Sequence, residues 1–423
     1  MKQTIQYRDK QIQTDFGFIL ILLILGSISL FSLYNAFNLI KIGSGMSYLA
    51  KQGMWYGVGF FVMYVLSKMQ NEIIFKYVKV AYRYLMYALL YLFFSMLLFK
   101  FTGRTLPLTR PVNGAISWFQ IPAIGSFQPS EFIKIVLIVM TAQTIAHYQE
   151  KHPTPSIKED FQMLIQLAKF LVPPLFLIFL QPDTGLCLII GFTTLIILML
   201  CGIRRGYIYL FFGMIFFVVG VFFILYVFQK DILISIFSAY RLQRIDAWLD
   251  PESNILGSSN QLYTSLLSLG SAGLTGYGLQ ADIISIPEAH TDFIFAAIGQ
   301  CFGLFGTTII ILICIILDIY LLRIAYISKK RVDRLIVIGV VAMLLYQQIQ
   351  NTAMIVGLLP ITGITLPLIS YGGSSILSYF LSFAIVLNIS PVKKKTINIT
   401  NPFEGLGAAI DRTIKQLNRK KIS

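Results

Sequence analysis

FGFILILLILGSISLFSLYNAFN, residues 16–38, is an apolar run without a charged side chain. Hydrocarbon offers no hydrogen-bond partner to backbone N–H and C=O groups, so an unbroken run of about 20 residues predicts a spanning α-helix and excludes a barrel strand. Lys2, Arg8 and Lys10 precede the run, but its length and the lack of a small-residue cleavage site favour a retained anchor over a signal peptide.

Similar runs recur over most of the chain. The protein has 423 residues, of which 56% are hydrophobic and 13% charged, and this composition is too apolar for a soluble globular protein. We therefore expect an all-α, multi-pass membrane protein with one transmembrane domain over residues 1–390 and a basic cytoplasmic tail over residues 391–423. Windows of about 20 apolar residues predict about ten transmembrane helices, near residues 16–38, 50–68, 78–99, 131–148, 166–181, 184–202, 206–227, 292–319, 336–357 and 367–390.

The formal net charge of +15 reflects membrane topology rather than nucleic-acid binding, because the basic residues fall between apolar runs and form no compact module. They lie on one predicted side, which the positive-inside rule makes cytoplasmic, and an even number of spans places both termini there. These cations are Lys2, Arg8, Lys10, Lys68, Lys76, Arg204, Arg205, Lys329, Lys330, Arg331, Arg334 and Lys393 to Lys395.

Two connections on the predicted outer side, residues 100–130 and 228–291, are too long to be simple turns. Long loops often carry function. In the second, residues 231–249 alternate apolar and charged side chains at helical spacing, which predicts an interfacial helix on the outer leaflet.

No metal or cofactor site is predicted. The four cysteines lie in or next to apolar runs without paired spacing, so neither a disulfide framework nor a zinc site is indicated. Of the three histidines only His290 is near other candidate residues, and a lone histidine is more often a hydrogen-bonding residue than a metal ligand. A divalent cation that arrives with a substrate would leave no such pattern.

Ionisable side chains within or next to spanning helices are costly in lipid, so each is a candidate functional residue. Glu131 and Lys134 stand three residues apart at the outer end of the fourth predicted span, where they can pair. An ion pair that only ties helices together explains them equally well. Asp183 lies in the outer hairpin QPDTG, and Asp292 opens the eighth span without a cation within a helical turn in sequence.

Other outer residues could hold a charged or sugar-containing ligand. Lys51, Arg241 and Arg244 can bind a pyrophosphate or, alternatively, anchor the protein to lipid head groups. Trp118 can stack on a sugar or belong to the aromatic belt of the membrane interface. In GSAGLTGYG, residues 270–278, no strand precedes the glycines, so a nucleotide loop is not indicated. We expect them to let a head group approach the backbone, simple loop flexibility being the alternative.

Seven blocks of the sequence resemble the shape, elongation, division and sporulation proteins, the RodA and FtsW group. They occur in family order over nearly the whole chain, which is far more specific than any single short motif. The blocks are NGAISW (113–118), QPSEFIK (128–134), QPDTG (181–185), RIDAWLDP (244–251), GLTGYGL (273–279), PEAHTDFIFA (287–296) and GLLPITGITLPLISYGGSS (357–375).

The resemblance implies a peptidoglycan glycosyltransferase that polymerises lipid II at the outer face of the cytoplasmic membrane with a class B penicillin-binding protein as its transpeptidase. Residues 14–36 look closer to RodA, the elongation and cell-shape branch, than to the division branch. The family's essential aspartate matches Asp292. The implied or candidate substrate-binding residues are Lys51, Trp118, Glu131, Lys134, Asp183, Arg241, Arg244, Glu288 and His290.

Three departures from the family pattern stand out. The acidic G-E-E-x-G block is here GQCFG, residues 299–303, which puts a role for that carboxylate in doubt. Lys51 stands where arginine is common, so the charge is kept without bidentate geometry. NTAM, residues 351–354, also differs from the usual block.

We hypothesise that Asp292 is the general base that takes a proton from the acceptor sugar hydroxyl as it attacks the donor's anomeric carbon and a polyprenyl pyrophosphate leaves. We expect the start of a helix to keep Asp292 ionised. Lys51 with Arg241 or Arg244, or a divalent ion, would meet the leaving charge. The rival hypotheses are a flippase that moves the lipid-linked precursor through the same polar cavity and a scaffold that only positions other synthases.

Overall fold

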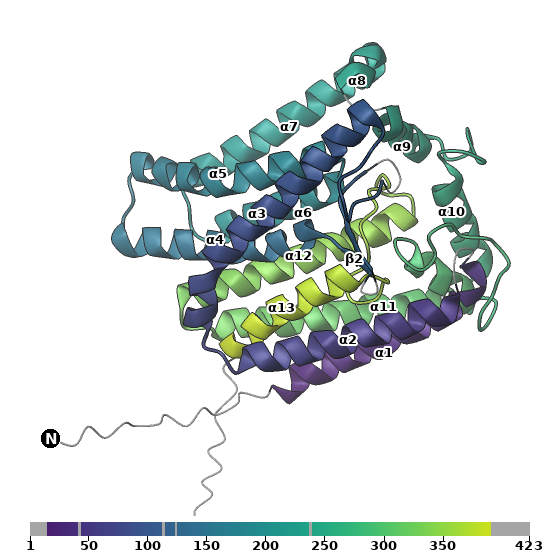
Figure 1. Cartoon of the computed structure of the whole chain (residues 1–423), viewed down its shortest axis with the longest axis horizontal. Coiled ribbons are helices and arrows are strands. Elements are labelled where there is room, and N and C mark those ends of the chain that lie inside the picture. Colours follow the sequence, from purple (N-terminus) through teal and green to yellow (C-terminus); the bar gives the residue numbers. More distant parts are fainter. Residues whose placement is uncertain (1–14, 41–43, 112–114, 123–124, 237–238, 391–423) are drawn as a thin grey trace, which may run out of the picture. The chain divides into compact units, whose positions relative to one another are not determined.

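The computed structural model describes residues 15–40, 44–111, 115–122, 125–236 and 239–390, and contacts group residues 14–391 into one compact unit. Within the described residues a long helix lies at each of the ten predicted positions, and these helices pack side by side (Figure 1). They are α1 (Phe16–Asn35), α2 (Gly45–Ser67), α3 (Asn71–Thr102), α4 (Pro129–Lys151), α5 (Ile157–Leu180), α6 (Thr184–Leu200), α7 (Arg205–Phe228), α11 (Ile294–Ile327), α12 (Arg331–Ile355) and α13 (Gly373–Ile389).

Seven of the described helices are long and apolar enough to cross a membrane, and α6 and α13 are shorter apolar helices. The predicted all-α, multi-pass class is therefore confirmed. α4 and α12 are the most buried of the seven, whereas α7 buries no residue and lies at the edge of the bundle (Figure 1). Because α7 is apolar on every face, lipid is the environment that its composition requires.

Four predicted helix boundaries are wrong by six residues or more. α3 begins at Asn71 rather than near 78, and α11 ends at Ile327 rather than near 319. The other two are the starts of α5 and α13. α5 begins at Ile157 rather than near 166, because Ser156 and Glu159 form a capping box. A hydropathy window misses this start, since Lys158, Glu159 and Asp160 make the first turn polar. α13 begins at Gly373 rather than near 367. The intervening LPLIS is apolar because it is a buried turn, and Leu368 in it has a φ of 63°.

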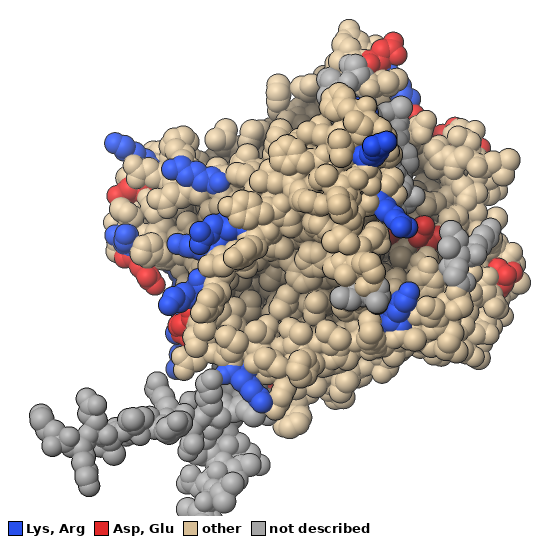
Figure 2. Space-filling model, viewed as in Figure 1, with Lys and Arg blue, Asp and Glu red and all other residues tan. Residues whose placement is uncertain are grey.

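Cations that the sequence places on the cytoplasmic side lie together at one end of the helices (Figure 2, left side). Lys330 pairs with Glu72 at 2.7 Å, Arg331 donates to the Cys201 carbonyl at 2.7 Å, and Arg204 donates to the Pro155 carbonyl at 2.7 Å. This grouping agrees with the positive-inside pattern. The cations before residue 15 and after residue 390 lie outside the described residues.

α11 is broken at Gly303, where φ is 60° and ψ is −151°. The loop 273–278 supplies hydrogen-bond partners to backbone groups on both sides of this break. Gly278 N donates to the Cys301 carbonyl at 2.9 Å, and Leu304 N donates to the Gly273 carbonyl at 3.0 Å. A Cβ on Gly276 would lie 2.4 Å from the backbone of Cys301. The prediction that these glycines admit a head group is therefore wrong for Gly276, which admits the backbone of α11.

The outer loops carry shorter elements. A hairpin of β1 (Phe119–Ile121) and β2 (Gly125–Phe127), with Gln120 opposite Ser126, precedes α4. The long second loop forms α8 (Lys230–Ile236), α9 (Ala239–Leu249) and α10 (Asn260–Ala272). α9 packs on the bundle, because Leu242 and Ala247 are buried in the protein and Trp248 donates to the Gly357 carbonyl. That this helix lies on the outer leaflet stays a prediction. Its amphipathic pattern reflects packing on the bundle.

Candidate active site

Residues 356–372 enter the helical bundle without forming a helix between α12 and α13. Backbone groups that are shielded from water need hydrogen-bond partners. Side chains from other elements supply them, so the segment is held in one conformation. The pairs are Trp248 with the Gly357 carbonyl, Gln350 with Pro360, Arg244 with Ile361, Asn351 with Ile364, Tyr56 with Leu368, Ser29 with Ile369 and Gln52 with Ser370.

Asp292 lies directly before α11 and faces this segment at Gly363. A Cβ on Gly363 would lie 3.5 Å from Asp292 Oδ2 and 3.8 Å from Arg244 Nη1, so the carboxylate and the guanidinium border the same small space. Gly363 has a φ of +72°, which favours glycine. Asp292 is half-buried as a residue, and its carboxylate faces a position without a side chain.

The Asp292 carboxyl group has a pKa of about 6, raised above its ordinary value first by burial and then by the negative charge of Glu288, which Arg244 opposes. Asp292 lies one residue before Phe293, the N-cap of α11, so its side chain does not cap that helix. At neutral pH about nine in ten such groups are ionised. Asp292 is therefore poised to accept a proton.

His290 belongs to an aromatic group next to Asp292. Its ring centroid lies 4.6 Å from that of Tyr48 and 6.0 Å from that of Tyr371. Burial lowers the pKa of His290, which favours the neutral imidazole. Lys51 is exposed on α2 one turn after Tyr48, so α2 presents this cation on the side that contacts His290.

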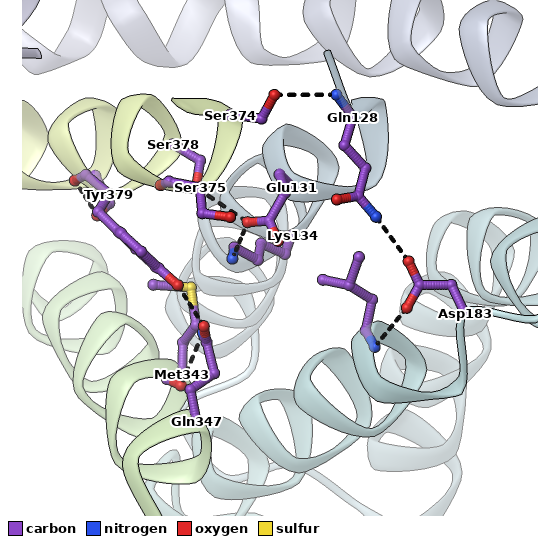
Figure 3. Close-up of polar contacts among 12 residues, drawn as sticks. Gln128, Glu131, Lys134, Asp183, Met343, Gln347, Ser374, Ser375, Ser378 and Tyr379 are labelled. Carbon is purple, nitrogen blue, oxygen red and sulfur yellow. Dashed lines mark hydrogen bonds and ion pairs between the residues drawn. The ribbon is translucent and has the colours of Figure 1, made fainter. Parts of the chain in front are cut away.

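Glu131 and Lys134 form an ion pair, as the sequence predicted, within a buried network of α4, α12 and α13 (Figure 3). Lys134 is 2% exposed, and its ammonium group lies 4.7 Å from the centroid of the Tyr379 ring. Ser378 donates to Glu131, and Tyr379 donates to Gln347. These contacts use the polar atoms of the pair on the protein itself, so they favour the helix-tying role that the sequence left open.

Asp183 caps α6 and makes a separate set of polar contacts near this network (Figure 3). Its carboxylate accepts from Gln128 Nε2 at 2.8 Å and from Leu186 N at 3.3 Å. Burial raises the pKa of Asp183 to about 6, and the Leu186 N–H opposes the rise. A Cβ on Gly185 would lie 3.3 Å from the Thr362 carbonyl oxygen. α6 therefore begins against the segment that carries Gly363.

The remaining candidates are less central. Trp118 is half-buried, and the neighbouring Ser117 hydroxyl donates to the Gln181 carbonyl at 3.0 Å, which ties its segment to the QPDTG hairpin. The side chain of Arg241 lies outside the described residues. Gln300, at the departure from the acidic family block, is buried, accepts from Ile284 N at 2.8 Å and donates to the Ala281 carbonyl at 3.2 Å. An amide satisfies both groups, whereas a carboxylate could not donate.

Sequence reasoning missed three neutral polar residues of the site. Asn351 donates to the carbonyls of Asp292 and Ile364. Gln347 accepts from Tyr379, and Gln128 donates to Asp183. The signal was present, because QQIQN, residues 347–351, places four neutral polar side chains in a spanning helix. Screening only ionisable residues overlooked them. Within the part of the chain that the structure describes, no group of three or more His, Cys, Asp or Glu residues could hold a metal ion.

The profile of the FtsW, RodA and SpoVE family of cell cycle proteins matches residues 13–395. The chain is 35% identical over 66% of its length to "Probable peptidoglycan glycosyltransferase FtsW" of Trichlorobacter lovleyi, covering 69% of that protein. It is 32% identical over 67% of its length to peptidoglycan glycosyltransferase MrdB of Escherichia coli, covering 72%. It is also 31% identical over 66% of its length to stage V sporulation protein E of Bacillus subtilis, covering 72%.

Solved structures share the fold. The rod shape determining protein RodA of Thermus thermophilus, at 22% identity, has a TM-score of 0.60 and matches 89% of this chain and 96% of its own. A chain from a study of polymerization and crosslinking by a peptidoglycan synthase complex, also at 22% identity, has a TM-score of 0.67 and matches 89% of this chain and 97% of its own. The names of the relatives confirm the predicted enzyme class, a glycosyltransferase. The chain belongs to the FtsW, RodA and SpoVE family.

Proposed function

We propose that this glycosyltransferase polymerises lipid II, a disaccharide-peptide on polyprenyl pyrophosphate, into glycan strands at the outer face of the bacterial cytoplasmic membrane. The observation that supports this most is the meeting of Asp292 and Arg244 over Gly363, because one supplies a base and the other a cation at the same small space. Relatives named as peptidoglycan glycosyltransferases give the sugar class.

Asp292 acts as the general base in this proposal. The acceptor hydroxyl gives its proton to the Asp292 carboxylate while its oxygen bonds to the anomeric carbon of the donor. The bond from that carbon to the pyrophosphate oxygen breaks, and polyprenyl pyrophosphate leaves. A positioned carboxylate accelerates such a step by about two to four orders of magnitude. Its pKa of about 6 leaves it ionised at neutral pH but more basic than an exposed aspartate.

The cations around Asp292 stabilise the leaving charge. Arg244 lies at Gly363 and already donates to the Ile361 carbonyl at 3.3 Å, which orients its guanidinium. We assign the pyrophosphate to Arg244 and to the exposed Lys51, with Arg241 or a divalent ion as further positive charge. Glu288 and His290 border the acceptor, and Trp118 faces the sugars from the neighbouring loop.

Glu131, Lys134 and Asp183 shape the cavity in this proposal instead of reacting. Glu131 is 8% exposed and Lys134 is 2% exposed, so the two opposite charges neutralise each other in a buried site. In this proposal the pair and Asp183 orient α4, α6 and α13 around the 356–372 segment. Both chain termini face the cytoplasm, as the cation grouping supports. A class B penicillin-binding protein is the proposed transpeptidase partner, and the structural relative from a peptidoglycan synthase complex supports this.

Within the family we propose the elongation and cell-shape role, which the RodA-like residues 14–36 support. Expression in strains depleted of either the elongation or the division enzyme tests it. Restored rod shape is expected, and restored septation alone would place the chain in the division branch.

The activity is tested with purified protein in vesicles that contain labelled lipid II. Formation of glycan strands supports the proposal. Translocation of the head group without polymer would instead make the protein a flippase. If neither polymer nor translocation is observed, a scaffold role remains.

A further inference from the structure

A cavity of about 810 Å³ opens beside the candidate active site. Asp292 does not line this cavity, but Arg244 does, and Arg244 also reaches the space over Gly363 that the Asp292 carboxylate faces. α9, the loop that leads into α10, the start of α10, the loop before α11 and the 356–372 segment line this open cavity. The lining residues are Gln243, Arg244, Leu256, Gly257, Ser258, Asn260, Gln261, Pro287, Glu288 and Ile361.

The side chains that line this cavity do not suit two parts of the substrate, the pyrophosphate and the polyprenyl chain. Apart from Arg244, which reaches the space over Gly363, no cation among the described residues lines the cavity, and Glu288 adds a negative charge, so the rest of the cavity does not suit a pyrophosphate. A polyprenyl chain requires a largely apolar wall, but only Leu256, Pro287 and Ile361 provide large apolar side chains. The remaining side chains are mostly neutral amides and a hydroxyl, which both donate and accept hydrogen bonds.

Sugars with hydroxyl and N-acetyl groups match such a wall. Their polar edges pair with amides and hydroxyls, and their apolar ring faces pack on side chains such as Pro287 and Ile361. Cavities of about 300–1,000 Å³ hold ligands of several rings, so this cavity has room for more than one sugar. Among the described residues, the side-chain amides of Gln243 and Gln261 make no hydrogen bond with the protein, whereas Asn260 Nδ2 donates to the Ile255 carbonyl at 3.0 Å.

We propose that this cavity binds the glycan strand, a neutral N-acetylated saccharide chain, next to the sugar that reacts at Asp292. The proposal rests on the polymerase function. Binding there keeps the strand on the enzyme between additions, so many bonds form before the strand is released. The side-chain amides of Gln243 and Gln261 form hydrogen bonds with the strand. Asn260 instead stabilises the loop around residues 255–260 through its hydrogen bond to the Ile255 carbonyl.

The test uses the full-length protein in nanodiscs and the double variant Gln243→Ala/Gln261→Ala. Gln229→Ala is the matched control, because Gln229 is an exposed amide at the end of α7 and does not line the cavity. Loss of two hydrogen bonds should make the mean strand length about tenfold shorter. A soluble tetramer of β-1,4-linked N-acetylglucosamine should inhibit wild type and control, and about tenfold more should be needed for the double variant.

Ser258→Trp is a second variant, which fills the cavity instead of removing its amides and should shorten strands as well. Unchanged strand length and unchanged tetramer inhibition in both variants would overturn the proposal. Saturation-transfer NMR with the tetramer separates this failure from failure of the polymerase function. Tetramer binding that is lost in the double variant keeps the saccharide site even if no polymer forms, and polymer without variant effects rejects the site alone.

Discussion

The side-chain amide of Asn351 donates one hydrogen bond to the backbone carbonyl of Asp292 at 2.8 Å and a second to the Ile364 carbonyl at 2.7 Å. Asn351 is fully buried in α12. One amide therefore fixes the backbone of the proposed base and the segment beneath its carboxylate at the same time. The neighbouring Gln350 donates to the Pro360 carbonyl of the same segment at 3.1 Å, and among the described residues its side chain makes no hydrogen bond to Asp292.

Replacing Asn351 by Leu should lower kcat for polymerisation by about 100-fold, because a displacement of about 1 Å at a reacting group has that effect. Gln350→Leu removes a bond to the same segment without freeing Asp292, so its kcat should stay within about threefold of wild type. Asn351→Gln tests rescue by an amide. Equal losses in the Asn351 and Gln350 leucine variants would show that Asn351 stabilises the segment in general.

The rate should depend on the ionisation of Asp292. A general base works ionised, so with a pKa of about 6 the rate of polymerisation should fall about tenfold per pH unit below pH 6. Glu288→Gln removes a negative neighbour that raises this pKa, which should move the acid limb to lower pH. Arg244→Gln removes the cation that lowers it, which should move the limb to higher pH. Steady-state rates between pH 4.5 and about 8 measure the limb, and shifts in the same direction for both variants would contradict the assignment.

Gly363→Ala should abolish polymerisation while the protein still folds. The added methyl group would lie 3.5 Å from Asp292 Oδ2 and occupy the space that the reacting hydroxyl needs. The backbone strain is matched in Gly357→Ala, because φ is +72° at Gly363 and +79° at Gly357, where the methyl group would meet only the side chain of Leu266. Each substitution should cost about 1–3 kcal/mol of stability. Comparable activity in the two variants would show that the space over Gly363 is not used.

Lys134→Met should destabilise the protein by about 3–5 kcal/mol, because it leaves the buried Glu131 without its partner. The double variant Glu131→Gln/Lys134→Met removes both charges and should recover most of that loss. Thermal unfolding in detergent measures the difference. Full stability of the double variant with normal polymerisation supports a helix-tying role, whereas full stability without activity would assign the pair to the substrate.

The sequence predicted the positions of the long helices because lipid imposes one strong rule, a sustained apolar run for each span. The same rule misread residues 367–372, since a buried turn is as apolar as a helix. It also missed the start of α5, because the first turn of this helix carries the charged Lys158, Glu159 and Asp160. Helix positions are thus set locally by composition, but their ends depend on capping and tertiary contacts.

The site was predictable only in part. Asp292 stood out because a carboxylate next to a spanning helix is costly. Its relation to Arg244 was not visible, since α9 and α11 are far apart in sequence and meet through the 356–372 segment. Asn351 was overlooked because a neutral amide in an apolar helix carries no charge signal. The pairing of the loop 273–278 with the break at Gly303 likewise required the folded chain.

The central claim is that the carboxylate of Asp292 removes the proton during polymerisation. Purified wild type, Asp292→Asn and Asp292→Ala should be compared for glycan synthesis from lipid II, with and without divalent ions. Their thermal unfolding temperatures should be measured first, to show that all three proteins are folded. We predict that both variants fold like wild type and make no polymer under either condition. Strand synthesis by Asp292→Asn near the wild-type rate would contradict the claim, because an amide cannot accept that proton.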